Sequence, residues 1–400
     1  MTDHIIYMDN AATTATRPEV LEAMLPYFTE HYGNPSSIHS VGRDARRAVE
    51  KARAQVAAAL GAQSSEIYFT GCGTESDNWA IKGTAFAKRD KGNHIITTAI
   101  EHHAVLHTCQ WLEKQGFQVT YLPVDEYGRV RVEDVEKAIT DKTILISIMA
   151  ANNEIGTLEP IAEIGKLAHE KGILFHTDAV QAVGAIPLDV NAMNIDMLSM
   201  SGHKFHGPKG IGALYIRKGV RPDVFMHGGA QERAQRAGTE NLAGIVGMGK
   251  AIELATQNLE ANAARMTRLR DKLIDGILAE IPEVRLNGHR TERLPNNVNV
   301  SIRYIEGEAL LLRLDLAGIA GSSGSACTSG SLDPSHVLLA IGLPHEIAHG
   351  SLRLSLGTDS TEAEVDEVLR VLPGIVKDLR AMSVLNAETS TLGANCPFMK

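Results

Sequence analysis

The chain has 400 residues, of which 44% are hydrophobic and 22% are charged, and its formal net charge at pH 7 is −9. This composition is that of a globular protein with a large core, and the negative charge gives no support to binding of nucleic acid or of an anionic membrane surface. No stretch reaches the roughly 18 uninterrupted apolar residues that a membrane span needs, and the first residues do not resemble a signal peptide. The four cysteines form no C-x-x-C pair, so we expect a cytoplasmic protein with reduced thiols and no structural zinc site.

The first predicted elements are two amphipathic helices. Residues 17–28 place Pro18 near a helix start and carry one apolar stripe, formed by Val20, Leu21, Met24, Leu25 and Phe28. Residues 43–61 repeat the pattern and end at Gly61, a plausible helix C-cap.

Short β-rich runs then alternate with helical segments. Most are almost continuously apolar, which suits strands that are covered on both faces. They span residues 94–102, 143–156, 172–181, 195–204 and 210–217. A helical pattern at residues 160–172 separates two of them. This alternation predicts an α/β fold with a mostly parallel sheet.

Polar side chains cluster at the ends of these runs. They are Glu101 and His102, Asn152 and Asn153, Asp178 and Gln181, and residues 201–204. Ligands of open α/β sheets bind outside the carboxyl ends of the strands. We therefore expect these side chains to share one site.

The last third of the chain has a different pattern of apolar and polar residues. A long, charged helical stretch at residues 250–281 leads to residues 296–303 and 350–357, which alternate apolar and polar side chains as half-exposed strands do. This region is predicted to form a second, smaller α+β domain. Residues 386–400 show no periodicity and are predicted to be a flexible tail.

Lys204 is the first candidate for chemistry. It follows an apolar strand, stands between two histidines and precedes a glycine–proline turn. It is either a solvated loop lysine or an amine with a lowered pKa, fit to form a Schiff base with an aldehyde cofactor. One such cofactor, pyridoxal phosphate, also needs an acid at its ring nitrogen, a stacking partner and donors for its phosphate.

The sequence offers a candidate for each of these needs. Asp178 can supply the acid, although it could instead cap a helix. His102 can stack on the ring. Residues 71–78 follow an apolar run and place Thr74 at a predicted helix start, which makes an anion cradle.

Ten motifs in this order resemble those of the pyridoxal-phosphate-dependent cysteine desulfurases of the NifS and IscS type, from residue 9 to about residue 357. They read DNAATT, GNPSSIH, GCGTESDN, IEHHAVLH, NNEIG, HTDAVQAVG, SGHKFHGPKG, RAGTEN, SSGSACTSGSLDPSH and GSLRLSLG. The segments EHHAVLH and RAGTENLAGIVG resemble most the nitrogen-fixation branch, NifS. This resemblance implies the fold of the aspartate aminotransferase superfamily, pyridoxal-phosphate fold type I. It also implies a homodimer with active sites at the subunit interface.

The same resemblance implies two domains. The larger, residues 14–258, is expected to bind the cofactor on a mainly parallel seven-stranded sheet. The smaller α+β domain is expected to combine residues 1–13 with residues 259–385 and to carry a cysteine loop at residues 321–333.

By resemblance, one group of residues holds the cofactor ring. Lys204 bonds to the aldehyde and later shuttles protons, Asp178 keeps the ring nitrogen charged, and His102 stacks on the ring and counts as catalytic. Asn153 and Gln181 contact the ring substituents.

A second group holds the phosphate and the substrate. The phosphate ligands are expected to be Gly73, Thr74, Ser201 and His203, with Thr239 contributed by the partner subunit. Arg353 lies on the strand face opposite its leucine neighbours, and its fork geometry suits the carboxylate of an amino acid; a solvent-facing arginine is the alternative. Asn153 is expected to contact the substrate as well.

Cys327 stands in a segment of glycine, serine and threonine that has little apolar surface to anchor it. The resemblance implies that its thiolate takes the sulfur of L-cysteine as a persulfide, that L-alanine is released, and that the segment swings to an acceptor. An incidental cysteine in a disordered loop is the alternative. Either His102 or the substrate amine could deprotonate the thiol.

The implied acceptor is an iron–sulfur scaffold protein, serving either nitrogenase or general cluster assembly. Cys327 could ligate a cluster during transfer, although no resident metal is expected. The other thiols have no assigned role. Cys72 is interpreted as a tolerated small side chain, Cys109 as core and Cys396 as part of the tail.

Three other functions compete with this one. Residues 345–349 match the zinc-peptidase pattern H-E-x-x-H, but the sequence offers no third ligand. The same fold could serve another reaction, such as that of a selenocysteine lyase, an aminotransferase or an epimerase, which would not need Cys327. A non-enzymatic sulfur carrier or scaffold would make no alanine.

Overall fold

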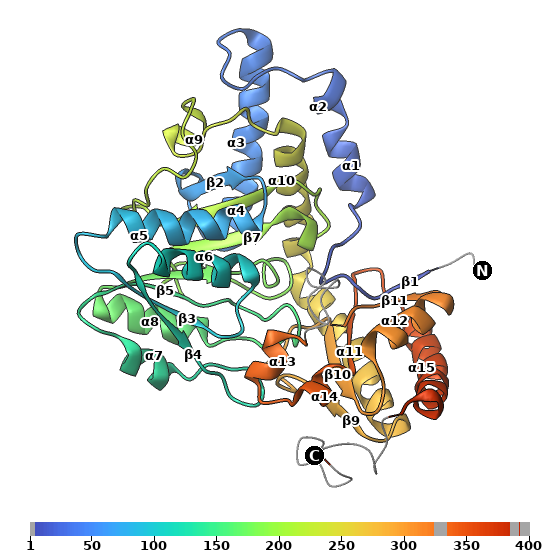
Figure 1. Ribbon diagram of the computed structural model, residues 1–400. Helices are drawn as coiled ribbons and strands as arrows, with labels where there is room; N and C mark the ends of the chain where they lie inside the picture. The colour runs from blue at the N-terminus through green and yellow to red at the C-terminus, as the bar shows by residue number, and fades with distance from the viewer. Residues whose placement is uncertain (1–4, 324–333, 385–391, 393–400) are drawn as a thin grey trace.

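A seven-stranded sheet forms the centre of the larger part of the molecule (Figure 1). The computed structural model describes residues 5–323, 334–384 and 392. The strand order is β2-β8-β7-β6-β5-β3-β4; β3 to β7 run parallel and β8 is antiparallel to both of its neighbours. The strands are β2 (Ile67–Thr70), β3 (His94–Thr98), β4 (Gln118–Leu122), β5 (Thr143–Ser147), β6 (Leu174–Asp178), β7 (Met197–Ser201) and β8 (Gly212–Ile216). The predicted α/β class and the mostly parallel sheet are confirmed.

Helices cover both faces of this sheet. One face packs against α1 (Pro18–Met24), α3 (Ser40–Leu60), α7 (Val132–Ala138), α8 (Ile161–Lys171) and α10 (Leu242–Gln257). The other face packs against α4 (Gly73–Asn78), α5 (Thr84–Ala87) and α6 (His103–Glu113). The central strands β3 and β7 are buried along their whole length and β6 along all but its first residue, as expected for strands covered on both faces, although they include buried polar residues such as His176 and Ser199.

The two N-terminal helical predictions have different outcomes. The second helix is α3, and Gly61 caps it in the left-handed conformation with φ 68°. The first predicted helix is divided into α1 and α2 (Pro26–Thr29), and its stripe is split as well. Val20 and Met24 are buried, whereas the other three stripe residues are largely exposed: Leu21, Leu25 and Phe28.

The smaller part of the molecule has its own sheet and its own hydrophobic core (Figure 1). Strand β10 (Asn297–Ile302) lies between β9 (Val284–Leu286) and β12 (Ser351–Ser355), antiparallel to both. Helices α11 (Leu259–Glu280), α12 (Gly307–Leu316) and α15 (Glu362–Met382) cover it. The predicted helical stretch at residues 250–281 is two helices, since α10 ends and α11 begins at Asn258.

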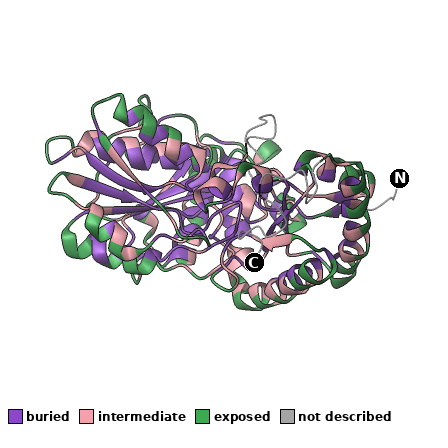
Figure 2. Ribbon diagram, turned by 60° about the horizontal axis from the view of Figure 1, so that its bottom comes forward, coloured by how far each residue is buried: buried purple, intermediate pink, exposed green. Residues whose placement is uncertain are grey.

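The prediction that the alternating strands are half-exposed is wrong. Every residue of β10 and β12 is buried. Figure 2 shows that buried residues run through the interior of the molecule and that exposed residues lie mainly on the outer helices and loops. The polar face of this sheet packs against the chain that follows β5: Asn297 and Asn299 each donate a side-chain hydrogen bond to the Glu154 carbonyl oxygen, at 3.1 and 3.0 Å. Alternating apolar and polar residues indicate that a strand has two chemically different faces. They do not indicate whether the polar face contacts water or another part of the protein.

The N-terminal segment joins the two parts. β1 (Ile6–Tyr7) pairs in parallel with β11 (Ile319–Ala320) of the smaller part, and residues 8–14 then cross to the larger one. The domain boundaries expected at residues 13/14 and 258/259 stay a prediction. Within the described residues, no helix is both long enough and apolar enough to cross a membrane.

Candidate active site

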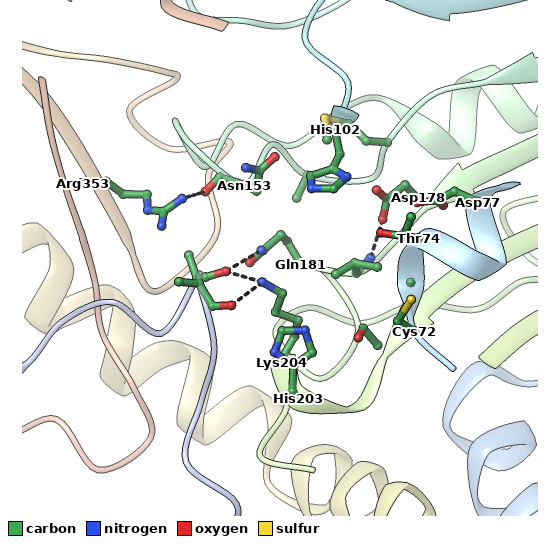
Figure 3. Close-up of a pocket in the computed structure, with 17 residues that line it drawn as sticks. Cys72, Thr74, Asp77, His102, Asn153, Asp178, Gln181, His203, Lys204 and Arg353 are labelled. Carbon is green, nitrogen blue, oxygen red and sulfur yellow. Dashed lines mark hydrogen bonds between the residues drawn. The ribbon is translucent and has the colours of Figure 1, made fainter. Parts of the chain in front are cut away.

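A cavity of about 210 Å³ lies at the carboxyl ends of β5, β6 and β7, where the large sheet meets the smaller part (Figure 3). Ten of the twelve predicted site residues line it: Gly73, Thr74, His102, Asn153, Asp178, Gln181, Ser201, His203, Lys204 and Arg353. The two others are Thr239, which is exposed and does not line the cavity of its own chain, and Cys327, which lies outside the described residues. Most of the polar side chains predicted to share a site at the strand ends therefore line this cavity, but Glu101 and Asn152 do not, and the role of each residue stays a prediction.

Lys204 ends the short 3-10 turn Gly202–Lys204 that follows β7. Its Nζ donates hydrogen bonds to the carbonyl oxygens of Ala11 and Ala12, at 2.6 and 2.9 Å. Gln181 Nε2 also donates to Ala11, at 2.9 Å. The crossing N-terminal segment therefore holds the lysine amine within the cavity.

Two carboxyl groups lie at the other side of the cavity. Asp178 ends β6, and its Oδ1 accepts a hydrogen bond from the Val180 amide at 2.9 Å. Burial raises the pKa of Asp178 to about 6, against the hydrogen bond and the positive charge of Lys204. Burial also raises the pKa of Asp77 well above its ordinary value, and the charge of Asp178 adds to this. The Lys204 charge and the Val180 amide favour the ionised form of Asp178, whereas burial and the neighbouring carboxyl groups favour the protonated form of Asp77.

Sequence reasoning missed Asp77. It lies on α4 four residues after Gly73, about one helical turn farther on, and such spacing puts two residues on one helix face. That spacing was the signal that could have found it. Its Oδ1 is buried without a hydrogen-bond partner among the described residues, 3.7 Å from His176 Nε2.

His102 caps the N-terminus of α6. Its Nδ1 accepts a hydrogen bond from the Ala104 amide at 3.1 Å, so the ring proton of the neutral form is on Nε2. Burial lowers the pKa of His102 to about 4, and the charges of Lys204, His336 and His107 act in the same direction. The ring is therefore neutral at pH 7 and presents a face to the cavity (Figure 3).

The predicted phosphate ligands gather at the start of α4. A side chain on Gly73 would come within 2.7 Å of Val180, so bare backbone forms this wall of the cavity. The first amides of a helix have no partner inside it and point toward an anion. His203 Nδ1 lies 3.0 Å from Thr13 Oγ1, and burial lowers the pKa of His203 to about 4. Cys72 is exposed and also lines the cavity.

Arg353 faces the carboxyl groups from across the cavity (Figure 3). It lies on β12 and is 1% exposed. Nη1 donates to the Asn153 carbonyl oxygen at 3.0 Å, and Nη2 donates to Asp9 Oδ1 at 2.9 Å. The alternative of a solvent-facing arginine is excluded by this burial.

The residues on either side of the Cys327 segment are tied to the cavity wall. On one side, the Ser322 amide donates to the Arg353 carbonyl oxygen at 3.0 Å. On the other, Ser335 Oγ donates to Glu154 and His336 Nε2 lies 3.0 Å from the Glu101 carbonyl oxygen. Helix α13 (His336–Ala340) begins there.

The remaining sequence candidates fall elsewhere. Cys109 is fully buried, as predicted, and burial raises the pKa of its thiol far above the ordinary value. Cys396 lies outside the described residues. The histidines of the zinc-peptidase pattern stand at the two ends of the four-residue helix α14 (His345–Ala348). In the described part of the chain, the one group of side chains spaced to hold a metal is Asp77, His102 and Asp178 in the cavity itself.

Comparison with known proteins decides the family. Residues 6–368 match the family described as aminotransferase class-V. This chain belongs to that family. A curated relative, cysteine desulfurase IscS of Methanosarcina thermophila, is 64% identical over 383 residues, which are 96% of this chain and 95% of the relative. The family members that this chain matches so extensively are cysteine desulfurases, which use pyridoxal phosphate.

Solved structures of relatives agree with this family. One, described as a NifS-like protein, superposes with a TM-score of 0.88 at 43% identity and covers 94% of this chain and 100% of its own. Another, described as SspA in complex with cysteine, has a TM-score of 0.79 at 40% identity and covers 89% and 100%. The fold-type-I prediction is confirmed. The assignment to the NifS branch is not supported by the 64%-identical relative, which carries the name IscS.

The cavity fits pyridoxal phosphate. It combines a primary amine, an ionised carboxylate and a neutral imidazole around one space, and Asp77 Oδ1 is a buried polar atom that lacks a partner among the described residues. The ring would be held by Lys204, Asp178 and His102. The phosphate would be held by Gly73, Thr74, Ser201 and His203.

Proposed function

We propose that this protein removes the sulfur of L-cysteine as a persulfide on Cys327 and releases L-alanine. The observation that carries the proposal is the placement of Lys204 and Asp178 in one cavity with the carboxylate-binding fork of Arg353 opposite. The neighbouring structure described with bound cysteine supports the choice of substrate.

Each of the main cavity residues has a separate role in the proposed reaction. Pyridoxal phosphate, when bound, supplies an electron-withdrawing ring that stabilises negative charge at the substrate Cα. Asp178 keeps the proton on the ring nitrogen, and His102 covers one ring face. Arg353 holds the carboxylate, and Lys204 Nζ takes the proton from Cα and returns it.

Cys327 then acts on the substrate sulfur. A bond forms between its Sγ and that sulfur as the carbon–sulfur bond breaks, and the electron pair of the broken bond stays on carbon, which takes up a proton. L-Cysteine and one thiol become L-alanine and one persulfide, so atoms and charge balance. Three residues lie between Ser323 and Cys327, so the two Cα atoms are at most about 14 Å apart at roughly 3.6 Å per residue. The hydrogen bond from the Ser322 amide to the Arg353 carbonyl oxygen places the start of this segment beside the cavity.

We also propose a homodimer in which Thr239 of one subunit completes the phosphate site of the other. Thr239 is exposed and lies outside its own cavity. Exposed apolar side chains on the first two helices and on the connection that follows them offer a surface for a second copy: Leu21, Leu25, Phe28, Tyr32 and Ile38.

For the sulfur acceptor we propose an iron–sulfur scaffold protein in the cytoplasm. The support is the name IscS of the 64%-identical relative, together with the resemblance of the motifs. A dedicated role in nitrogenase maturation rests only on the segments EHHAVLH and RAGTENLAGIVG.

One incubation tests the reaction. The purified holoenzyme, given L-cysteine and a thiol reductant, should yield L-alanine and sulfide in equal amounts. Cys327→Ala should retain the visible absorption of the bound cofactor and yield neither product. Alanine production by Cys327→Ala would point to another reaction on the same fold, and a wild-type protein that forms no alanine would contradict the proposal.

A mixing experiment tests the shared site. Lys204→Ala and Thr239→Asp should each be inactive at limiting cofactor. If Thr239 acts across the interface, a hybrid dimer of the two variants contains one intact site and regains activity. If Thr239 acts within its own subunit, every site in the hybrid carries one lesion and activity does not return.

A further inference from the structure

Arg353 already has a partner of opposite charge. Its side chain is 2% exposed and that of Asp9 is 19% exposed, and they form an ion pair with Nη2 2.9 Å from Oδ1. A buried guanidinium is costly without a counter-charge, so this pair neutralises Arg353 when no ligand is present. Among the described residues, no other ion pair is formed by Arg353.

Asp9 is fixed in place by the backbone around it. The adjacent residues bond to β12, with the Ser355 amide donating to the Met8 carbonyl oxygen at 2.7 Å and the Asn10 amide donating to Ser355 at 3.3 Å. The Tyr7 hydroxyl donates to the Asp9 carbonyl oxygen at 3.1 Å. The Asp9 backbone is therefore held beside β12 by the same crossing segment that holds Lys204.

Arg353 lines the cavity, and its guanidinium has donors that the hydrogen bonds to Asp9 and Asn153 do not use. It has five N–H groups, and the bonds to Asp9 and Asn153 account for two. Its Nε–H is buried and has no partner among the described residues. An incoming carboxylate can therefore bind without displacing Asp9, and the two carboxylates then share one positive charge.

We propose that Asp9 is a positioning residue that holds the Arg353 guanidinium in place and lowers its affinity for the α-carboxylate of an amino acid. This inference rests on the proposed role of Arg353 as carboxylate anchor. Like charges around one guanidinium repel each other, so the resident carboxylate lowers the affinity for both substrate and product. An enzyme that must release L-alanine after each turnover benefits from weak ground-state binding, since binding substrate and transition state more tightly by the same amount does not raise kcat.

The test measures L-alanine binding to the holoenzyme by calorimetry and KM and kcat for L-cysteine. Asp9→Asn keeps an oxygen acceptor for Nη2 but removes the charge. We expect L-alanine to bind about tenfold more tightly, equivalent to roughly 1.4 kcal/mol, and KM to fall while kcat does not rise. Asp9→Ser, measured in parallel, should also bind alanine more tightly. If Asp9→Asn does not fold, the result for Asp9→Ser decides the test.

Two controls show that the effect passes through Arg353. Asp378→Asn removes one carboxylate of an exposed pair with Arg313, 3.3 Å apart, and should leave alanine binding unchanged. In an Arg353→Ala background, Asp9→Asn should change alanine affinity less than about twofold, because the partner of the charge is gone.

Unchanged or weaker alanine binding in both Asp9 variants, with the cofactor spectrum of the wild type, would overturn the inference. An effect of equal size in the Arg353→Ala background would do so too. Failure of the proposed function has a different signature: wild-type protein would form no alanine from cysteine, although removing the Asp9 charge still tightened carboxylate binding.

Discussion

Replacement of Glu232 should destabilise the fold because it removes the buried partner of Arg53, whose other ion pair, at 3.4 Å, is with the half-exposed carboxylate of Glu50. Glu232 lies on α9 (Gln231–Ala234), and its carboxylate accepts hydrogen bonds from Arg53 Nη1 at 2.7 Å and Nη2 at 3.0 Å. The side chains of Arg53 and Glu232 are only 2% and 3% exposed. Glu232 also accepts from the Phe69 amide at 3.1 Å, which ties the segment before Thr239 to β2.

The magnitude follows from this burial. Removing one partner of a buried ion pair costs about 3–5 kcal/mol, a large share of the roughly 5–15 kcal/mol that keeps a domain folded. Burial acts to lower the pKa of Arg53, and the hydrogen bonds and charge of Glu232 outweigh it and leave that pKa raised, so Glu232 is the main group that stabilises the charged guanidinium in this buried position. We expect Glu232→Ala to lose about 3–5 kcal/mol and Glu232→Gln to lose less, because the amide still offers one acceptor oxygen.

Urea unfolding of the cofactor-free protein at fixed concentration gives these values, since bound cofactor would add its own stabilisation. Glu367→Ala is the matched control. Glu367 makes two hydrogen bonds to Arg370, at 2.8 and 2.6 Å, but on the surface, so its loss should have far less effect. A loss from Glu232→Ala no larger than that from Glu367→Ala would refute the reasoning.

Three further outcomes are expected. Lys204→Ala should lack the visible absorption of covalently bound cofactor; an unchanged spectrum would contradict its assignment. Asp178→Asn should retain cofactor but form alanine at least about a hundredfold more slowly, as loss of one preorganised charge commonly does, and near-normal turnover would count against a role at the ring nitrogen. His176 is buried, and burial lowers its pKa to about 3. Below about pH 6.5 the unfolded chain therefore binds a proton that the folded chain does not. The free energy of unfolding should fall as the pH drops from there toward 3, by roughly 1.4 kcal/mol per pH unit. His176→Asn should remove this part of the acid sensitivity in urea unfolding measured between pH 7 and 5, and an identical slope in both proteins would exclude it.

Local pattern by itself determined much of the larger part of the molecule. The strands around the site are buried on both faces, and their sequences are rich in apolar residues. Helix α3 ends at Gly61 because a left-handed cap favours glycine. Parallel strands also carry their polar termini to one edge of the sheet, which is why Asp178 and Lys204 could be expected to meet. These features depend on residues that are near one another in the sequence.

Only the tertiary structure decided what lies against those patterns. The polar face of β12 meets the larger domain rather than water, and Leu25 is exposed although it belongs to a helical stripe. Asp9 and Arg353 are 344 residues apart and are joined because β1 pairs with β11 beside β12. The hydrophobic periodicity and composition of a segment show which face of a helix or strand is apolar. Contacts between distant segments depend on the tertiary packing of the whole chain, and no local pattern contains that information.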